Sequence, residues 1–522
     1  MHSPKSGNFT FIALILAFAA VHAFHIWRLP VLPFIDLPNH LAEAYVSGNH
    51  GIHTSGVYYT ALSAYQPGSL HALFCGLFGS VELGNRIFYT SYLLLIPLGM
   101  LGLIRHSKGD GFFALFSLCW VYSYSVFWGF AGFTFAIPCV LISLWSFVSY
   151  LSSPKPHWFA VLTIGLLVTY YAHVLAFLFL STVLILSLIC LRGTHWRIRV
   201  VSILSILPVV LLCVLWTAGD RSWSQQGTLT GFLVEYYRFN FASSFLARIP
   251  HLFSDDNAAL AAGLGGHFVA LIWSLGLVVL LAVSIARGHL KMNDLSGGDV
   301  PYRVATIFLF TALGCVMFLP NSLPGQIILF ERFSVFVWLS LIWRLSRAVD
   351  SAPYRARVRY SMVALTLLHA LLWSHYFARF DTLIAEPLAH MLHREELHGA
   401  SLSAIMTDNS FRGRPLLIHV QNYQMVWNDG ITPTKASEYR FRILQKRDTA
   451  SVPRYTEWVG EGTNIPGLVN EYRSMDFLLL RGTKALDGVL PMAEYELIAA
   501  EGGWNLLGRR KVNAAPGFTR EP

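Results

Sequence analysis

Three ionisable side chains follow one another at helical spacing early in the chain. Asp36, His40 and Glu43 lie in the segment 33–43, where Pro38 favours the first turn of a helix. Positions i, i+4 and i+7 share one face of a helix, so we expect the three side chains on one surface. A carboxylate beside a histidine can take a proton from a substrate hydroxyl or hold a divalent metal ion. The alternative is that Asp36 caps the helix while the other two side chains face solvent.

Further polar groups interrupt apolar sequence later in the chain. His173 follows Tyr170 and Tyr171 in a long apolar stretch, where a histidine is either a binding group or a hydrogen-bonded core residue. Arg332 carries a planar fork of donors that matches phosphate oxygens. The alternatives for Arg332 are an ion pair with Glu331 or a contact with lipid headgroups. Weaker candidates of the same kind are Arg86, Asp220, Arg221 and Arg238.

The composition decides what kind of protein carries these groups. Of 522 residues, 54% are hydrophobic and only 13% are charged, against about 25% in an average globular protein. This excludes a soluble cytoplasmic protein and a disordered chain. The net charge of +9 arises within residues 1–380, which hold 22 Lys and Arg against 12 Asp and Glu, while residues 381–522 hold 16 against 17. Because the positive charges lie between long apolar runs, a nucleic-acid partner is excluded too.

The apolar runs predict an all-α polytopic membrane domain over residues 1–380, with an outer loop at 28–86. A spanning helix needs about 20 apolar residues. The stretch 158–191 is too long for one upright helix and is divided near His173, whereas Ser69–Val81 is too short to cross and is expected to be interfacial or re-entrant. About eleven spans result: 9–27, 87–105, 112–128, 133–152, 158–172, 174–191, 200–217, 266–286, 304–320, 333–346 and 360–378.

The distribution of basic residues between these spans predicts the orientation. With the N-terminus in the cytoplasm, the inner segments hold 15 of the 22 Lys and Arg, as the positive-inside rule requires. The first run extends to Trp27 and ten spans follow, so we expect an uncleaved helix rather than a signal peptide. The protein is therefore predicted in the plasma (inner) membrane with its C-terminal domain outside. Eight of the 12 acidic residues fall on the outer side, so polar chemistry is expected there.

Residues 381–522 have the charge density of a soluble protein and predict a small extracytoplasmic α/β domain. We expect an amphipathic helix over 381–400, and strands at 403–406, 416–420, 477–480 and 495–499, closed by a turn and strand at 501–507. Aromatic side chains in this domain either stack on sugar rings or pack in the core: Tyr423, Trp427, Tyr455 and Trp458. All six cysteines lie in apolar segments, so neither disulfides nor a cysteine metal site is expected.

The order of these features resembles the GT-C superfamily of integral-membrane glycosyltransferases. The likeness rests on a first outer loop with an acidic residue near a proline and a histidine, on paired short helices around His173, and on an exported C-terminal domain. The segments Tyr65–Leu73 and Phe78–Arg86 resemble those that lead into the second span of protein mannosyltransferases and aminoarabinose transferases.

The resemblance implies a polyprenyl-phosphate-linked sugar donor in the outer leaflet and a glycan, lipid or protein acceptor. It also implies that an acidic residue of the first outer loop acts as base or orients the acceptor, which points to Asp36. This sequence has a lone Asp36 where many members carry paired acidic residues, so a requirement for a divalent metal ion and catalytic competence both stay open. Two other classes are a transporter or flippase of a lipid-linked sugar, and a non-catalytic scaffold of envelope polysaccharide assembly.

The candidate site is then a membrane glycosyltransferase site on the outer face. Asp36 and His40 are the expected catalytic residues. The expected substrate-binding residues are Glu43, Arg86, Tyr171, His173, Asp220, Arg221 and Arg332.

Overall fold

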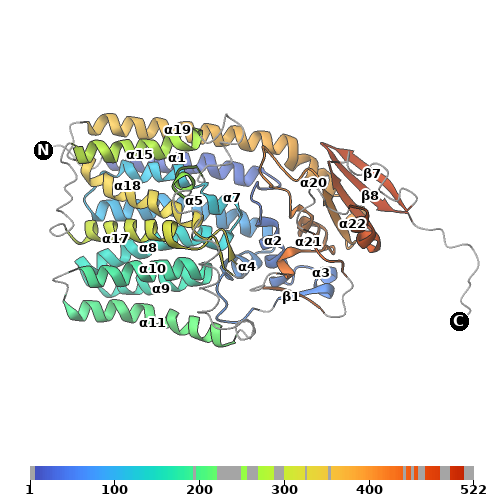
Figure 1. Ribbon diagram of the computed structural model, residues 1–522, viewed down its shortest axis with the longest axis horizontal. Coiled ribbons are helices and arrows are strands. Elements are labelled where there is room, and N and C mark those ends of the chain that lie inside the picture. The colour runs from blue at the N-terminus through green and yellow to red at the C-terminus, as the bar shows by residue number, and fades with distance from the viewer. Residues whose placement is uncertain are drawn as a thin grey trace, which may run out of the picture.

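The chain forms a long helical bundle with a smaller mixed assembly at one end (Figure 1). The structure is a computed structural model, and it describes residues 6–60, 62–191, 195–219, 248–254, 268–286, 299–323, 326–350, 354–438, 443–447, 452–456, 465–482 and 494–510. The elements of the first outer loop and those of the C-terminal tail gather at the same end of the bundle.

Among the described residues, six helices are long and apolar enough to cross a membrane, so the protein is an integral membrane protein. The last of them continues without a break as far as Leu392. The first five are α1 (Ser6–Arg28), α5 (Val81–His106), α8 (Ala131–Ser152), α11 (Trp196–Gly219) and α17 (Val300–Phe318), and the sixth starts with α19 (Arg355–Phe380).

The other predicted spans are also helical, and all of them except 266–286 are shorter. The predicted division of the stretch 158–191 is confirmed, because one helix ends at Ala172 and the next begins at Val174, on either side of His173. The segment 112–128 is broken into three short pieces rather than one helix. The exact number of eleven spans stays a prediction. The helices of these other spans are α6 (Phe112–Phe116), η1 (Ser117–Trp120), α7 (Tyr124–Phe127), α9 (Pro156–Ala172), α10 (Val174–Cys190), α15 (Phe268–Ala286) and α18 (Ser334–Asp350).

The bundle core is built mainly from aromatic and branched side chains. Trp120 and Trp338 stack with ring centroids 5.9 Å apart, and Trp343 donates to the hydroxyl of Ser107 across 2.6 Å. α11 and α15 by contrast expose many large apolar side chains, as helices facing lipid do.

The first outer loop folds into short elements above the bundle. α2 (Leu37–Ser47) packs against α4 (Leu70–Gly76), and α3 (Ile52–Val57) leads into the strand β1 (Tyr58–Thr60). The segment Ser69–Val81, predicted to be too short to cross, contains only the two turns of α4 before α5 begins.

The tail contains a four-stranded mixed sheet in the order β4-β6-β8-β7. β4 and β6 are parallel and the other neighbours are antiparallel, which confirms four of the five predicted strands. The turn between β7 and β8 is made by Gly502 and Gly503, both at positive φ. The strand bounds are β4 (Leu402–Met406), β6 (Phe477–Arg481), β7 (Tyr495–Glu501) and β8 (Trp504–Arg509).

One prediction for the tail is wrong and another holds only in part. The run 416–420 forms turns that lead into η6 (Val420–Asn422), not a strand. All five of its side chains are buried. The run therefore lacks the alternation of buried and exposed side chains that a strand with one solvent-facing side shows, and it packs between the tail and the bundle. The helix expected over 381–400 ends at Leu392 after a π-helical turn, and one 3-10 turn, η5 (Glu395–Leu397), follows it.

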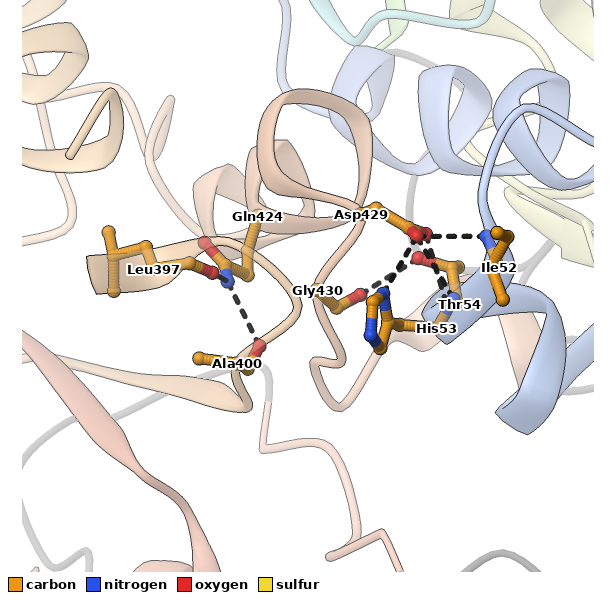
Figure 2. A network of polar contacts seen from close by, with 8 residues as sticks. All are labelled: Ile52, His53, Thr54, Leu397, Ala400, Gln424, Asp429 and Gly430. Atoms are coloured by element: carbon orange, nitrogen blue, oxygen red, sulfur yellow. Dashed lines mark hydrogen bonds and ion pairs between the residues drawn. The ribbon is translucent and has the colours of Figure 1, made fainter. Parts of the chain in front are cut away.

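The first loop and the tail are joined by backbone pairing. β1 pairs antiparallel with β5 (Leu444–Lys446), although the two strands come from opposite ends of the chain. Asp429, just after α21 (Tyr423–Asn428), accepts hydrogen bonds from the backbone amides of Ile52, His53 and Thr54 at the start of α3 (Figure 2). The carboxylate therefore caps α3 from the other end of the chain.

Candidate active site

Asp36 is fixed by the turn between α7 and α8. Its backbone amide donates to the carbonyl of Trp128 across 2.9 Å. Gly129 has a φ of +75°, and a Cβ added there would lie 2.7 Å from the backbone nitrogens of Asp36 and Leu37. A glycine is thus required for the bundle to approach the start of α2 this closely.

The Asp36 side chain does not cap α2, although Asp36 occupies the N-cap position. Its Oδ1 instead lies 3.1 Å from Nε2 of His419, a fully buried histidine of the tail. Nδ1 of His419 in turn lies 2.7 Å from the hydroxyl oxygen of Tyr455, and that hydroxyl also contacts the carbonyl of Ile418. The capping alternative for the Asp36 side chain is therefore wrong.

His40 and Glu43 share one face of α2 and form an ion pair. His40 Nδ1 lies 2.9 Å from Glu43 Oε2, and the ring of His40 packs edge-on near His71, which bonds to Asn85. Burial alone would lower the pKa of His40, but the hydrogen bond to Glu43 and the negative charges of Glu43 and Asp36 outweigh it, so the pKa of His40 is raised above 6.5.

Arg332 and His173 meet although they belong to different elements. Arg332 lies in η3 (Glu331–Phe333), is buried, donates from Nε to the carbonyl of Ile328, and lies 3.7 Å over the ring of Phe130. Its Nη1 is 3.2 Å from Nε2 of His173. The His173 Nδ1 accepts the backbone N–H of Leu175, so it acts as the N-cap of α10.

These groups lie close enough for their charges to act on one another. Asp36 raises the pKa of Arg332, against the larger lowering effect of burial. After burial, which is the main cause, the positive charges of Arg332 and His40 lower the pKa of His173 well below 6.5, so its imidazole is neutral at pH 7. Four predicted site residues thus converge at the end of the bundle where the first loop and the tail gather.

Two other predicted binding residues have structural partners elsewhere. Arg86 donates to the carbonyls of Trp27 and Leu29 and so braces the end of α1. The hydroxyl of Tyr171 donates to the carbonyl of Ala64 across 2.7 Å and fixes the first outer loop. Asp220, Arg221, Arg238 and Trp458 lie outside the described residues.

The aromatic residues of the tail are largely engaged in packing. Trp427 donates to Glu82 across 2.7 Å and stacks on His393 with ring centroids 4.3 Å apart, and Tyr423 packs beside it. His393 begins a histidine-rich and glutamate-rich stretch in the sequence. In the described part of the chain, no three His, Cys, Asp or Glu side chains are grouped to hold a metal ion.

His419 is the residue that sequence reasoning missed. It lies inside a short apolar run of the tail, which is the same signal that singled out His173. The sequence pattern predicts a strand for this run, and a strand gives no reason to connect its histidine with the first loop. Only the packing of the tail onto α2 brings His419 to Asp36.

Comparison with known proteins identifies the fold. No family model and no curated protein matches the sequence. The structure is similar to the crystal structure of ArnT from Cupriavidus metallidurans bound to undecaprenyl phosphate, with a TM-score of 0.56 and 11% identity over 99% of this chain and 100% of that chain. The fold is GT-C-like. The resemblance drawn from the first loop is thereby confirmed for the fold, over the full length of the chain.

Proposed function

We propose that this protein is a membrane glycosyltransferase that moves a sugar from a polyprenyl-phosphate-linked donor to an acceptor hydroxyl. The proposal is supported by the GT-C-like fold and by one arrangement at the outer end of the bundle, where a carboxylate lies within electrostatic reach of a buried guanidinium. In our proposal residues 1–380 form the membrane domain and 381–522 the extracytoplasmic one. The N-terminus is cytoplasmic, the membrane is the inner membrane, and the acceptor is a glycan, lipid or protein.

The donor's phosphate fits beside Arg332 and His173. Both ring nitrogens of His173 face donors, because the Leu175 amide donates to Nδ1 and Nη1 of Arg332 lies 3.2 Å from Nε2. A neutral imidazole can accept only one of these hydrogen bonds, since its other nitrogen carries the ring proton. With the proton on Nε2, a phosphate oxygen placed beside both groups would accept from Nε2 of His173 and from Nη1 of Arg332. Two converging donors, one of them charged, are suited to one phosphate oxygen.

Asp36 is proposed as the base. The acceptor oxygen forms a bond to the anomeric carbon, its proton passes to the Asp36 carboxylate, and the bond from that carbon to the phosphate oxygen breaks. The electron pair leaves on the phosphate, where Arg332 stabilises the charge. His40 and Glu43 line the same side of α2 and are proposed to contact the acceptor or the sugar.

The test is release of free undecaprenyl phosphate by the purified, reconstituted protein from a panel of undecaprenyl-phosphate sugars, followed by mass spectrometry. We expect release that needs an acceptor, and its loss in Asp36→Asn with unchanged expression and folding. Asp408→Asn, which alters an exposed carboxylate of the tail sheet, serves as the matched control. Movement of the donor between leaflets without release would favour the flippase alternative, and donor binding without turnover would favour the scaffold.

A further inference from the structure

We infer that His419 is a positioning residue for Asp36 and that the two side chains share one proton. This inference deepens the proposed function and rests on it for its kinetic consequence. It assigns part of the reaction site to the C-terminal tail, which otherwise looks like a separate domain.

His419 cannot reorient freely. Its side chain is fully buried, whereas that of Asp36 is 15% exposed. On the far side of the ring, the hydroxyl of Tyr455 lies between His419 Nδ1 and the carbonyl of Ile418. The imidazole is thus held between a tyrosine on one side and the candidate base on the other.

The partners of Tyr455 determine which ring nitrogen carries a proton. The Ile418 carbonyl can only accept, so the single hydroxyl proton of Tyr455 must point to it. The Tyr455 oxygen then accepts from His419, which places a proton on Nδ1. If this were the only ring proton, an unprotonated Nε2 would lie 3.1 Å from the negative Oδ1 of Asp36, which is electrostatically unfavourable.

One proton carried by the pair removes this repulsion. Nε2 has no hydrogen-bond partner of good geometry among the described residues, so the contact with Oδ1 corresponds to an ion pair and not to a straight hydrogen bond. In the proposed reaction the pair without this proton takes the acceptor proton on Asp36, and His419, 3.1 Å away, shares it.

Other charged groups near the start of α2 also act on Asp36. Arg332 from the turn before α18 and His40 from α2 itself both interact with its charge. Glu43 is paired with His40 and His173 lies beside Arg332. Within the described residues, only His419 contacts the Asp36 carboxylate directly and leaves Oδ2 for the acceptor.

The kinetic test compares His419→Gln with a matched variant. Glutamine keeps the size and an N–H donor but cannot share a proton, so we expect kcat to fall about 100-fold while KM changes by less than about threefold. Tyr455→Phe, which leaves Nδ1 without its acceptor, should lower kcat by about three- to tenfold. His53→Gln changes another loop-to-tail histidine–aspartate pair with the same 3.1 Å separation, and should leave kcat within about twofold. A kcat within about threefold of the wild type in His419→Gln would overturn the inference.

A second measurement does not depend on turnover. Asp36→Asn, His419→Gln and the double variant are compared in thermal unfolding, and the midpoint shift of the double variant should be clearly smaller than the sum of the two single shifts. Additive shifts would contradict the shared proton. If the wild type transfers no sugar but the shifts are non-additive, the proposed function fails while the Asp36–His419 pair stands.

Discussion

The side-chain amide of Asn422 donates a 2.6 Å hydrogen bond to Oδ1 of Asn39, which lies 383 residues earlier in the chain. Both side chains are buried. Asn39 is on the first turn of α2, three residues after the candidate base, and Asn422 is three residues after His419. The tail thus packs onto the helix that carries Asp36, the candidate base.

The pairing of β1 with β5 predicts that a disulfide can be engineered between the two strands. Tyr59 and Gln445 are register partners, and the Tyr59 hydroxyl donates to the Gln445 side chain across 2.7 Å. Partners in an antiparallel ladder have Cα atoms about 4.5–5.5 Å apart, which suits a disulfide. The variant Tyr59→Cys/Gln445→Cys should therefore form an intramolecular bond, detected by mass spectrometry of a protease digest. A variant with only one of the two cysteines should not form this bond. If the double variant stays reduced under oxidising conditions, the loop and the tail are not paired through β1 and β5.

Asp429 should be needed to dock the tail on the loop. Its φ is +48° and its carboxylate accepts three backbone amides of the loop, as drawn in Figure 2. Burial would raise the pKa of Asp429, but these hydrogen bonds outweigh it and lower the pKa, so the carboxylate is ionised near neutral pH. We expect Asp429→Ala to weaken the docking by about 2 kcal/mol and to speed limited proteolysis of the first loop.

Two matched variants separate the causes of that effect. Asp429→Gly removes the cap but relieves the positive φ, and Asp429→Asn keeps one acceptor and tolerates the same backbone. We expect proteolysis of the first loop to be fastest in Asp429→Ala, slower in Asp429→Gly, slower again in Asp429→Asn, and slowest in the wild type. Equal rates for Asn and Ala would show that the hydrogen bonds to the loop contribute little.

Arg332→Lys should impair use of the donor while keeping the charge. Lysine lacks the planar fork that reaches the Ile328 carbonyl and the space beside His173 at once. Loss of one charge-assisted hydrogen bond predicts a fall in kcat/KM for the donor of about 10- to 100-fold. Arg344→Lys, whose guanidinium donates to Tyr302 far from the site, is the control. An unchanged kcat/KM in Arg332→Lys would remove Arg332 from the phosphate site.

The His40–Glu43 pair predicts a pH-dependent stability. Because the pKa of His40 is raised on folding, the pair stabilises the protein fully below about pH 6.5 and loses this contribution as the pH rises through the raised value. The melting temperature of Glu43→Gln should therefore lie furthest below that of the wild type near pH 6 and approach it by pH 8.5. If the difference in melting temperature between the wild type and Glu43→Gln grew as the pH rises, His40 would be neutral in the folded protein.

Several features could be predicted from the sequence alone. The apolar runs fix a helical membrane bundle, because a run of about 20 apolar residues is a property of consecutive positions and needs no knowledge of tertiary contacts. The break at His173 and the strands near 403, 477, 495 and 504 were found for the same reason, since their signals are local. The spacing of His40 and Glu43 also sufficed, because one helical turn brings them together.

Only the tertiary structure decided what surrounds Asp36. Its contact with His419 joins the two ends of the chain, and nothing in either local segment specifies it. The apolar run around His419 predicts a strand, but apolar residues bury equally well in a strand or in turns, and the bundle surface determines which of the two forms. The sequence thus determined a membrane bundle with polar groups at its outer end, whereas the packing of the tail onto α2 determined which of those groups meet.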